Sequence, residues 1–155
     1  MKRLLVPAAT AAAAAVLVFA VVNATAGSSR AKAGGSIHVI EHATTDAVTN
    51  GTAGDSAGNT LTFANDVYDA ADAHKVGSDQ GYCVRIVVGA TWECNWTTFL
   101  PGGQITVEGP FSDTGDTVVA VTGGTGAYRN VRGSMQLTYH NPAGTEFDFV
   151  FDLIG

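Results

Sequence analysis

Strict alternation of side chains in the last part of the chain constrains the fold more than any other feature. Between Glu146 and Leu153 every second residue is phenylalanine or leucine, and two aspartates and a valine occupy the positions between them. Successive side chains of a β-strand point to opposite faces, so a period of two predicts a strand with one apolar face. The same alternation recurs in Gly103–Phe111 and Ser134–His140. We therefore expect a fold built from strands that share an apolar side.

Turn-forming residues divide the chain into further alternating segments. All 19 glycines lie at or after Gly27, and such an excess favours tight turns over long helices. Short separators such as Asp79–Gly81, Pro101–Gly103 and Asn141–Gly144 imply antiparallel neighbours, which close into a barrel or pair as a sandwich. The eight expected strands are Ser36–His42, Thr60–Asp69, Gly81–Val88, Thr91–Leu100, Gly103–Phe111, Thr117–Thr122, Ser134–His140 and Glu146–Leu153.

The first 26 residues have the pattern of a secretory signal peptide. Lys2 and Arg3 precede an apolar run, and Ala24–Ala26 form an A-x-A cleavage signature before Gly27. An uncleaved membrane anchor is the alternative, because the apolar run over residues 4–22 is just long enough to span a bilayer. The early Pro7 and the cleavage signature favour export.

Export defines the expected domain organisation and charge. We expect residues 1–26 to be removed, residues 27–59 to form a flexible leader that contains the first strand, and residues 60–155 to form one barrel domain. The formal charge of the whole chain is −6, and loss of Lys2 and Arg3 leaves six basic against fourteen acidic residues, a net charge of −8. This excess argues against nucleic acid or an anionic membrane as a partner. The mature chain is expected to be secreted, without stable membrane association.

The two cysteines lie on either side of one predicted turn. A four-residue loop from Val87 to Ala90 places Cys83 and Cys94 directly opposite each other on neighbouring strands. In an exported chain this arrangement predicts a disulfide, with a pair of buried free thiols as the alternative. A metal pair is disfavoured, because no C-x-x-C motif or nearby histidine completes a set of ligands.

The same register places Arg85 opposite Trp92, on the side of the sheet that carries the two cysteines and Trp96. A guanidinium among indoles can hold a carboxylate, and it can stabilise negative charge that develops on a substrate oxygen. The alternative is an arginine whose stem crosses a tryptophan on the outer surface of the sheet. Both interpretations stay open at this stage.

A serine-hydrolase motif is present in form only. Gly54–Gly58 matches G-x-S-x-G, but a nucleophile elbow needs a strand before the serine and a helix after it. Ser56 lies instead in a segment rich in glycine, threonine and asparagine that precedes a strand. We interpret this segment as a linker.

Histidines and acidic residues near the strand ends match no known metal motif. His38 and His42 lie roughly 13 Å apart on a strand, too far for one ion. Asp66, Asp69 and Asp72 do not have the spacing of a calcium-binding loop, which favours solvated turn residues. The sequence therefore predicts no metal site.

A glycine-dense corner carries a family resemblance. Gly123–Arg129 lacks the order of a phosphate-binding loop and is expected to be a geometric or anion-holding corner. Together, Gly123–Gly133, Trp92–Thr97 and Gly103–Pro110 resemble the allene oxide cyclase barrel-like family, which is related to plant dirigent proteins and allene oxide cyclases. The resemblance covers about Thr60–Gly155.

The resemblance implies an eight-stranded antiparallel β-barrel with an internal ligand pocket and no metal or organic cofactor. It also implies that the chain can form a homo-oligomer. It brings Tyr128 and Arg132 of the glycine corner into the expected site. The expected catalytic residues are thus Arg85 and Arg132. The pocket is expected to be lined by Trp92, Trp96, Tyr128 and Tyr139.

Three functions remain open from the sequence. The first is a cofactor-independent isomerase or cyclase, or a stereo-directing dirigent-like protein, that confines a hydrophobic small molecule. The second is a non-catalytic barrel that binds such a molecule. The third is an extracellular structural or interaction protein with a filled core. The size of the internal cavity discriminates among them.

Overall fold

The computed structural model describes residues 34–154, so the expected signal peptide lies outside the described residues. Within this range no helix is long and apolar enough to span a membrane. The described chain is almost entirely β-structure, with one short 3-10 helix, η1. The elements are β1 Gly35–His42, β2 Ala47–Asn50, β3 Thr60–Asp69, β4 Lys75–Val87, β5 Thr91–Leu100, β6 Gly103–Ser112, β7 Thr117–Gly124, η1 Gly126–Tyr128, β8 Arg132–Tyr139 and β9 Glu146–Ile154.

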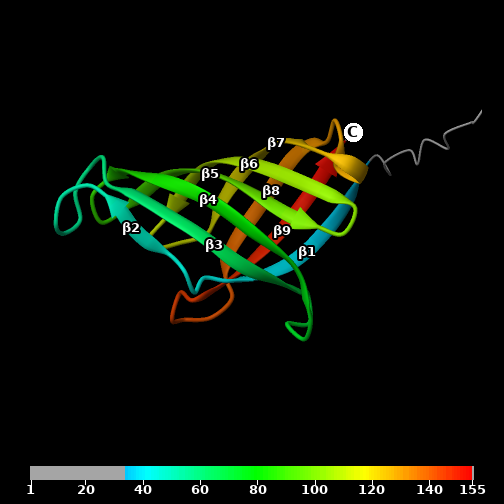
Figure 1. Cartoon of the computed structure of the whole chain (residues 1–155), viewed down its shortest axis with the longest axis horizontal. Coiled ribbons are helices and arrows are strands. Elements are labelled where there is room, and N and C mark those ends of the chain that lie inside the picture. The colour runs from blue at the N-terminus through cyan, green and yellow to red at the C-terminus, as the bar shows by residue number, and fades with distance from the viewer. Residues whose placement is uncertain (1–33, 155) are drawn as a thin grey trace, which may run out of the picture.

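The strands form a closed antiparallel barrel (Figure 1). Their order is β1-β9-β8-β7-β6-β5-β4-β3-β2, and an additional pairing between β1 and β3 closes the ring. Eight strands therefore make the barrel, as the sequence predicts. The ninth strand, β2, was not expected, and it pairs with the first part of β3 while β1 pairs with the last part. β1 and β2 thus pair with different parts of the same edge of β3.

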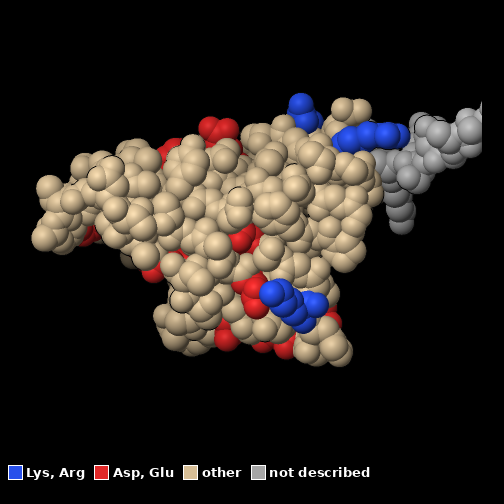
Figure 2. Space-filling model, in the orientation of Figure 1, with Lys and Arg blue, Asp and Glu red and all other residues tan. Residues whose placement is uncertain are grey.

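The apolar parity of the sequence points into the barrel. Phe149 and Phe151 of β9 are at most 1% exposed, and Ile105 and Val107 of β6 are fully buried. The alternating aspartates and polar residues of the same strands lie on the outside. The apolar face of these strands therefore points into the barrel. The face of the molecule seen in Figure 2 carries a few small basic groups beside scattered acidic ones.

The turn expected at Asp79–Gly81 is wrong, because β4 begins at Lys75 and continues through this segment. Gly81 lies opposite Trp96 on β5. A Cβ atom on Gly81 would lie 2.3 Å from the Cβ of Trp96. The glycine therefore allows the close approach of β5 at Trp96, and it does not end a strand.

The wall is interrupted between β1 and β2. Residues 43–46 leave the ladder, and the side chain of Asn65 on β3 replaces the missing partner. Its Oδ1 accepts hydrogen bonds from the backbone N–H groups of Thr44 and Thr45, at 3.1 and 3.0 Å. Asn65 is 1% exposed. This interruption brings Asp46 to the interior side of the barrel.

The glycine corner is a structural corner of the barrel. Gly126 adopts a φ of +59°, and a Cβ there would lie 2.1 Å from the carbonyl oxygen of Gly102. The next residue, Ala127, donates its backbone N–H to that same carbonyl at 2.8 Å. The motif therefore packs η1 against the β5–β6 turn. Of the two roles expected for it, geometric or anion-holding, this contact is the geometric one.

Candidate functional site

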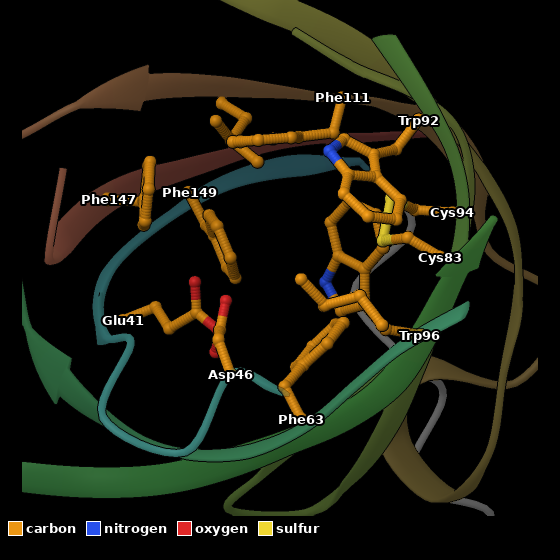
Figure 3. A pocket seen from close by; sticks show the side chains of 12 residues that line it. Glu41, Asp46, Phe63, Cys83, Trp92, Cys94, Trp96, Phe111, Phe147 and Phe149 are labelled. Atoms are coloured by element: carbon orange, nitrogen blue, oxygen red, sulfur yellow. A yellow bond between two sulfur atoms is a disulfide. The ribbon is translucent and has the colours of Figure 1, made fainter. Parts of the chain in front are cut away.

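One internal cavity lies among side chains from most of the barrel strands (Figure 3). Its volume is about 60 Å³, enough for a few water molecules and smaller than the usual site for a small molecule. Aromatic rings form most of its surface, and two carboxylates face them from β1 and the β1–β2 interruption. The lining residues are Glu41, Asp46, Leu61, Phe63, Cys83, Trp92, Cys94, Trp96, Phe111, Leu137, Phe147 and Phe149.

The cysteines form the predicted disulfide, which is part of the cavity wall. Cys83 and Cys94 are register partners on β4 and β5 and are linked to each other. Both are at most 6% exposed. The disulfide links the two strands that also carry Trp92 and Trp96 of the cavity. The indoles therefore lie on a cross-linked part of the wall.

A buried acidic cluster lies on the side of the cavity opposite the disulfide. No pattern in the sequence predicted it. Glu41 of β1 and Asp79 of β4 are 6% and 2% exposed. Asn65 Nδ2 donates a hydrogen bond to Glu41 and another to Asp46, both at 2.8 Å. The backbone N–H of Asn65 donates to Asp79 at 3.3 Å. Asp46 is exposed, so the cavity reaches the surface beside it.

Burial changes the protonation of this cluster. Loss of solvent is the largest cause that raises the pKa of Glu41 to about 7; the hydrogen bond from Asn65 opposes it, and the charge of Asp46 adds to it. Burial, and next the charge of Glu41, hold the pKa of Asp79 well above its ordinary value. Asp79 therefore holds its proton more tightly than an ordinary aspartate, and Glu41 gains and loses one near neutrality.

The aromatic side of the cavity offers an unused hydrogen-bond donor. Trp96 is 3% exposed, and its Nε1 has no hydrogen-bond partner. A buried N–H without a partner loses the hydrogen bonds that water would supply. In Figure 3 the indole of Trp96 and the carboxyl of Glu41 lie on opposite sides of the same space. A ligand oxygen between them could accept from both.

The expected arrangement of Arg85 and Trp92 is confirmed, but the guanidinium does not line the cavity. It lies 3.8 Å above the centre of the Trp92 ring. Its Nε donates to Asp55 at 2.7 Å and its Nη1 donates to Asp113 at 2.5 Å. Trp92 Nε1 also donates to Asp113, at 3.0 Å. Two carboxylates thus neutralise Arg85, which leaves it no free charge for a ligand.

These contacts explain the segment that resembles a serine-hydrolase motif. Asp55 of Gly54–Gly58 binds Arg85 through one oxygen and accepts the backbone N–H of Gly89 through the other, at 2.7 Å. The segment therefore attaches to the barrel next to the β4–β5 turn. The linker interpretation did not include this attachment.

The remaining expected site residues do not line the cavity. Arg132 is exposed at the start of β8 and donates to the carbonyl of Val131 at 2.7 Å. Tyr128 donates from its hydroxyl to Pro101 at 3.3 Å. Tyr139 contacts the rings of the cavity wall and donates to the carbonyl of Ser112 at 3.0 Å. None of the three lines the space, so their roles in a site stay predictions that the geometry does not support.

The fold and site define a class of protein: a closed antiparallel barrel with an apolar cavity, buried carboxyls and aromatic walls. The allene oxide cyclase family model matches residues 37–144. The chain therefore belongs to the allene oxide cyclase family.

Solved structures show the same fold at low sequence identity. A pyocyanin demethylase has 24% identity and a TM-score of 0.65 over 76% of this chain and 98% of its own. The pterocarpan synthase dirigent protein GePTS1 has 16% identity and a TM-score of 0.64 over 77% and 87%. AbnU, an exo-specific intermolecular Diels-Alderase, has 17% identity and a TM-score of 0.63 over 79% and 98%. The comparison with curated proteins finds no match.

Proposed function

We propose that the chain binds a small hydrophobic molecule inside the barrel and acts on it as a cofactor-independent isomerase or cyclase. The observation that carries this proposal is the carboxyl of Glu41, whose pKa is raised to about 7, on the wall of an apolar cavity. A group that titrates near neutrality can both donate and accept a proton at little cost. The unpaired N–H of Trp96 supplies a second polar contact across the same space.

The geometry supports a simple division of roles. Trp96 Nε1 donates to an oxygen of the bound molecule and stabilises negative charge that develops there. Glu41 gives a proton to the reacting molecule while a bond forms or shifts, and it takes one back as the product forms, so an isomerisation leaves the enzyme unchanged. The phenylalanine and disulfide walls exclude water and hold the molecule in one conformation. Solved structures of the same fold include an exo-specific intermolecular Diels-Alderase and a pterocarpan synthase dirigent protein.

The lining restricts the class of ligand. An internal volume of about 60 Å³ admits an organic molecule only after ring side chains such as Phe63 and Phe111, both half-buried, move outward. Asp46 at the opening and Glu41 within disfavour an anion at neutral pH. We therefore expect a flat, uncharged molecule with one oxygen that accepts a hydrogen bond.

Binding of two matched probes tests the proposal. Benzyl alcohol and benzoate differ mainly in charge, and both should change tryptophan emission if they enter beside Trp92 and Trp96. We expect benzyl alcohol to bind equally between pH 5.5 and 8.5, and benzoate to bind more tightly at the lower pH, where Glu41 is protonated. Glu41→Gln should abolish the pH dependence for benzoate, whereas the exposed control Glu108→Gln should keep it. Failure of both probes to change the emission at any pH would contradict an internal binding site.

A filled barrel with a structural role is the second candidate, and the small volume of the cavity favours it. Native mass spectrometry of the purified chain separates the two. A retained small molecule supports the binding function. A chain that carries no small molecule and excludes both probes supports the filled barrel.

We also propose that the chain is exported after cleavage behind residue 26. The disulfide between Cys83 and Cys94 supports this, because disulfides persist in oxidising compartments. Sequencing of the secreted protein should give an N-terminus at Gly27. Recovery of the full-length chain from membranes would contradict the proposal.

A further inference from the structure

The histidines of the chain all lie on the outer side of the barrel, each beside an aspartate. The sequence has four histidines, and none of them lines the internal cavity. Three of the four gather around the seam between β1 and β9. The pairs are His38–Asp148 at 2.6 Å, His140–Asp148 at 3.0 Å, His42–Asp72 at 2.7 Å and His74–Asp69 at 3.0 Å.

One of these pairs has a third donor. A ring nitrogen of His42 and one carboxylate oxygen each of Asp72 and Glu146 all lie within 4.8 Å of one another. His42 ends β1, Glu146 begins β9, and the two residues are register partners. Asp72 reaches them from the β3–β4 turn. Three separate parts of the fold thus place one donor each at the same point.

Local contacts hold two of these donors in place. The ring of Tyr68 stacks on His42 with 4.1 Å between centroids and an angle of 16°. Asp72 has a φ of 53°, in the left-handed region that few non-glycine residues adopt. The turn before it is fixed by Asp69, whose Oδ1 accepts the backbone N–H groups of Ala71 and Ala73. The donors are therefore ordered before any ligand binds.

The charge at this point is unbalanced. Two carboxylates surround one imidazole, and Glu146 makes no ion pair among residues 34–154. Lys75, at the start of β4, pairs instead with Asp66 at 2.6 Å. A divalent cation would neutralise both carboxylates.

We propose that His42, Asp72 and Glu146 bind a Zn²⁺-type transition-metal ion on the outer wall of the barrel. Zinc binds imidazole nitrogen and carboxylate oxygen at about 2.0–2.2 Å, so small side-chain movements bring these three donors into its coordination sphere. The imidazole ligand favours zinc over calcium or magnesium, which prefer oxygen donors alone. Three protein ligands leave a fourth position for water.

Such an ion has a structural consequence at the seam. It would link the end of β1, the start of β9 and the β3–β4 turn, which are distant in sequence. A ligand that binds only the folded chain stabilises it. Zinc should therefore raise the melting temperature, and magnesium should not.

Calorimetric titration of the oxidised, purified chain with zinc chloride tests the proposal. We expect one zinc ion per chain, and at least about tenfold weaker binding in Glu146→Gln and in Asp72→Asn. His74→Gln is the matched control, because His74 also pairs with an aspartate but has no third donor, and its zinc affinity should stay within about twofold.

Asp148→Asn distinguishes the neighbouring group of His38, Asp148 and His140. Zinc binding that survives in Asp148→Asn and weakens in Glu146→Gln supports the proposed ligands. The reverse pattern, equal weakening in every variant including His74→Gln, or no binding of zinc to the parent chain would overturn them. Circular dichroism of each variant confirms that the barrel is folded before the titration is compared.

Discussion

Glu41 and His42 are neighbours in β1, yet they lie on opposite sides of the barrel wall. The carboxyl of Glu41 faces the cavity and accepts a hydrogen bond from Asn65, and its pKa is raised to about 7 by burial. The imidazole of His42 faces outward toward Asp72. One step along a strand thus separates a buried acidic group from an outer group of histidines and acids.

The outer carboxyls behave in the opposite way from the inner ones. Burial of Asp148 acts to raise its pKa, but hydrogen bonds from His38 and His140, with the charges of the two rings, together lower it. The side-chain hydrogen bond with Asp148 correspondingly raises the pKa of His140. The comparison shows that burial and hydrogen-bond partners, rather than the residue type, set the direction in which the pKa of an acid moves in this barrel.

The largest expected effect comes from removing the amide that holds the inner cluster together. In Asn65→Ala, Glu41 and Asp46 lose their shared donor, and the backbone at Thr44 and Thr45 loses its acceptor. We expect a loss of about 3–5 kcal/mol in the free energy of unfolding, measured by denaturant titration. Asn95→Ala on the outer side of β5 is the control and should cost at most about 0.5 kcal/mol. Equal losses would mean that the inner position has no special role.

A pH titration of stability should reveal the inner carboxyl directly. Between pH 4.5 and 7 the folded chain keeps a proton on Glu41 that the unfolded chain has released, so the free energy of unfolding falls as the pH rises. A pKa raised from 4.5 to about 7 corresponds to about 3 kcal/mol over this window. Glu41→Gln should reduce this slope and leave only the part that comes from the raised pKa of Asp79. A variant that keeps the parent slope would show that Glu41 titrates normally.

The disulfide is expected to contribute less than the inner hydrogen bonds. The double variant Cys83→Ser with Cys94→Ser should lower the free energy of unfolding by about 2–3 kcal/mol, mainly because the unfolded chain gains freedom. A reducing agent should destabilise the parent chain to the same degree and leave the double variant unchanged. If the reductant affects both equally, the disulfide is not the cause.

The smallest expected change in stability comes from Asp148 and its two histidine partners on the outer wall. The lowered pKa of Asp148 means that its stabilising contribution is present above its ordinary pKa of 3.8 and is lost as the pH falls. Asp148→Asn should therefore be less stable than the parent at pH 5 by about 1 kcal/mol or less, and the difference should shrink by pH 3. Denaturant titrations at the two pH values measure it. A difference that stays constant would exclude the charge of Asp148 as its source.

The sequence predicts the wall of the barrel better than its contents. Strict alternation in β9 defines the inward face, and the two cysteines fix the register that places Arg85 opposite Trp92. These features are local, since side-chain parity and a short turn determine them. The pairing of Arg85 with Asp55 and Asp113 depends on loops that meet only in the folded barrel, so spacing in the sequence could not reveal it.

The acidic residues inside the barrel are harder to predict from the sequence than its wall. Glu41 lies on the parity of Ile37 and Val39, so a charged residue on the apolar face of the first strand was the available clue. Asp79 was hidden because its neighbour Gly81 made the segment look like a turn. Asp46 enters the cavity through the interruption after β1, which no periodic pattern marks.

Pairing between β1 and β9 also governs how the barrel can assemble. Residues 35–42 of β1 pair with residues 146–153 of β9. This edge of β1 therefore stays unpaired until β9 has been synthesised and has docked. Contacts of such long sequence separation make folding slow, and they leave an unpaired strand edge available to other chains meanwhile. Conditions that delay synthesis or release of β9 should therefore favour aggregation through β1.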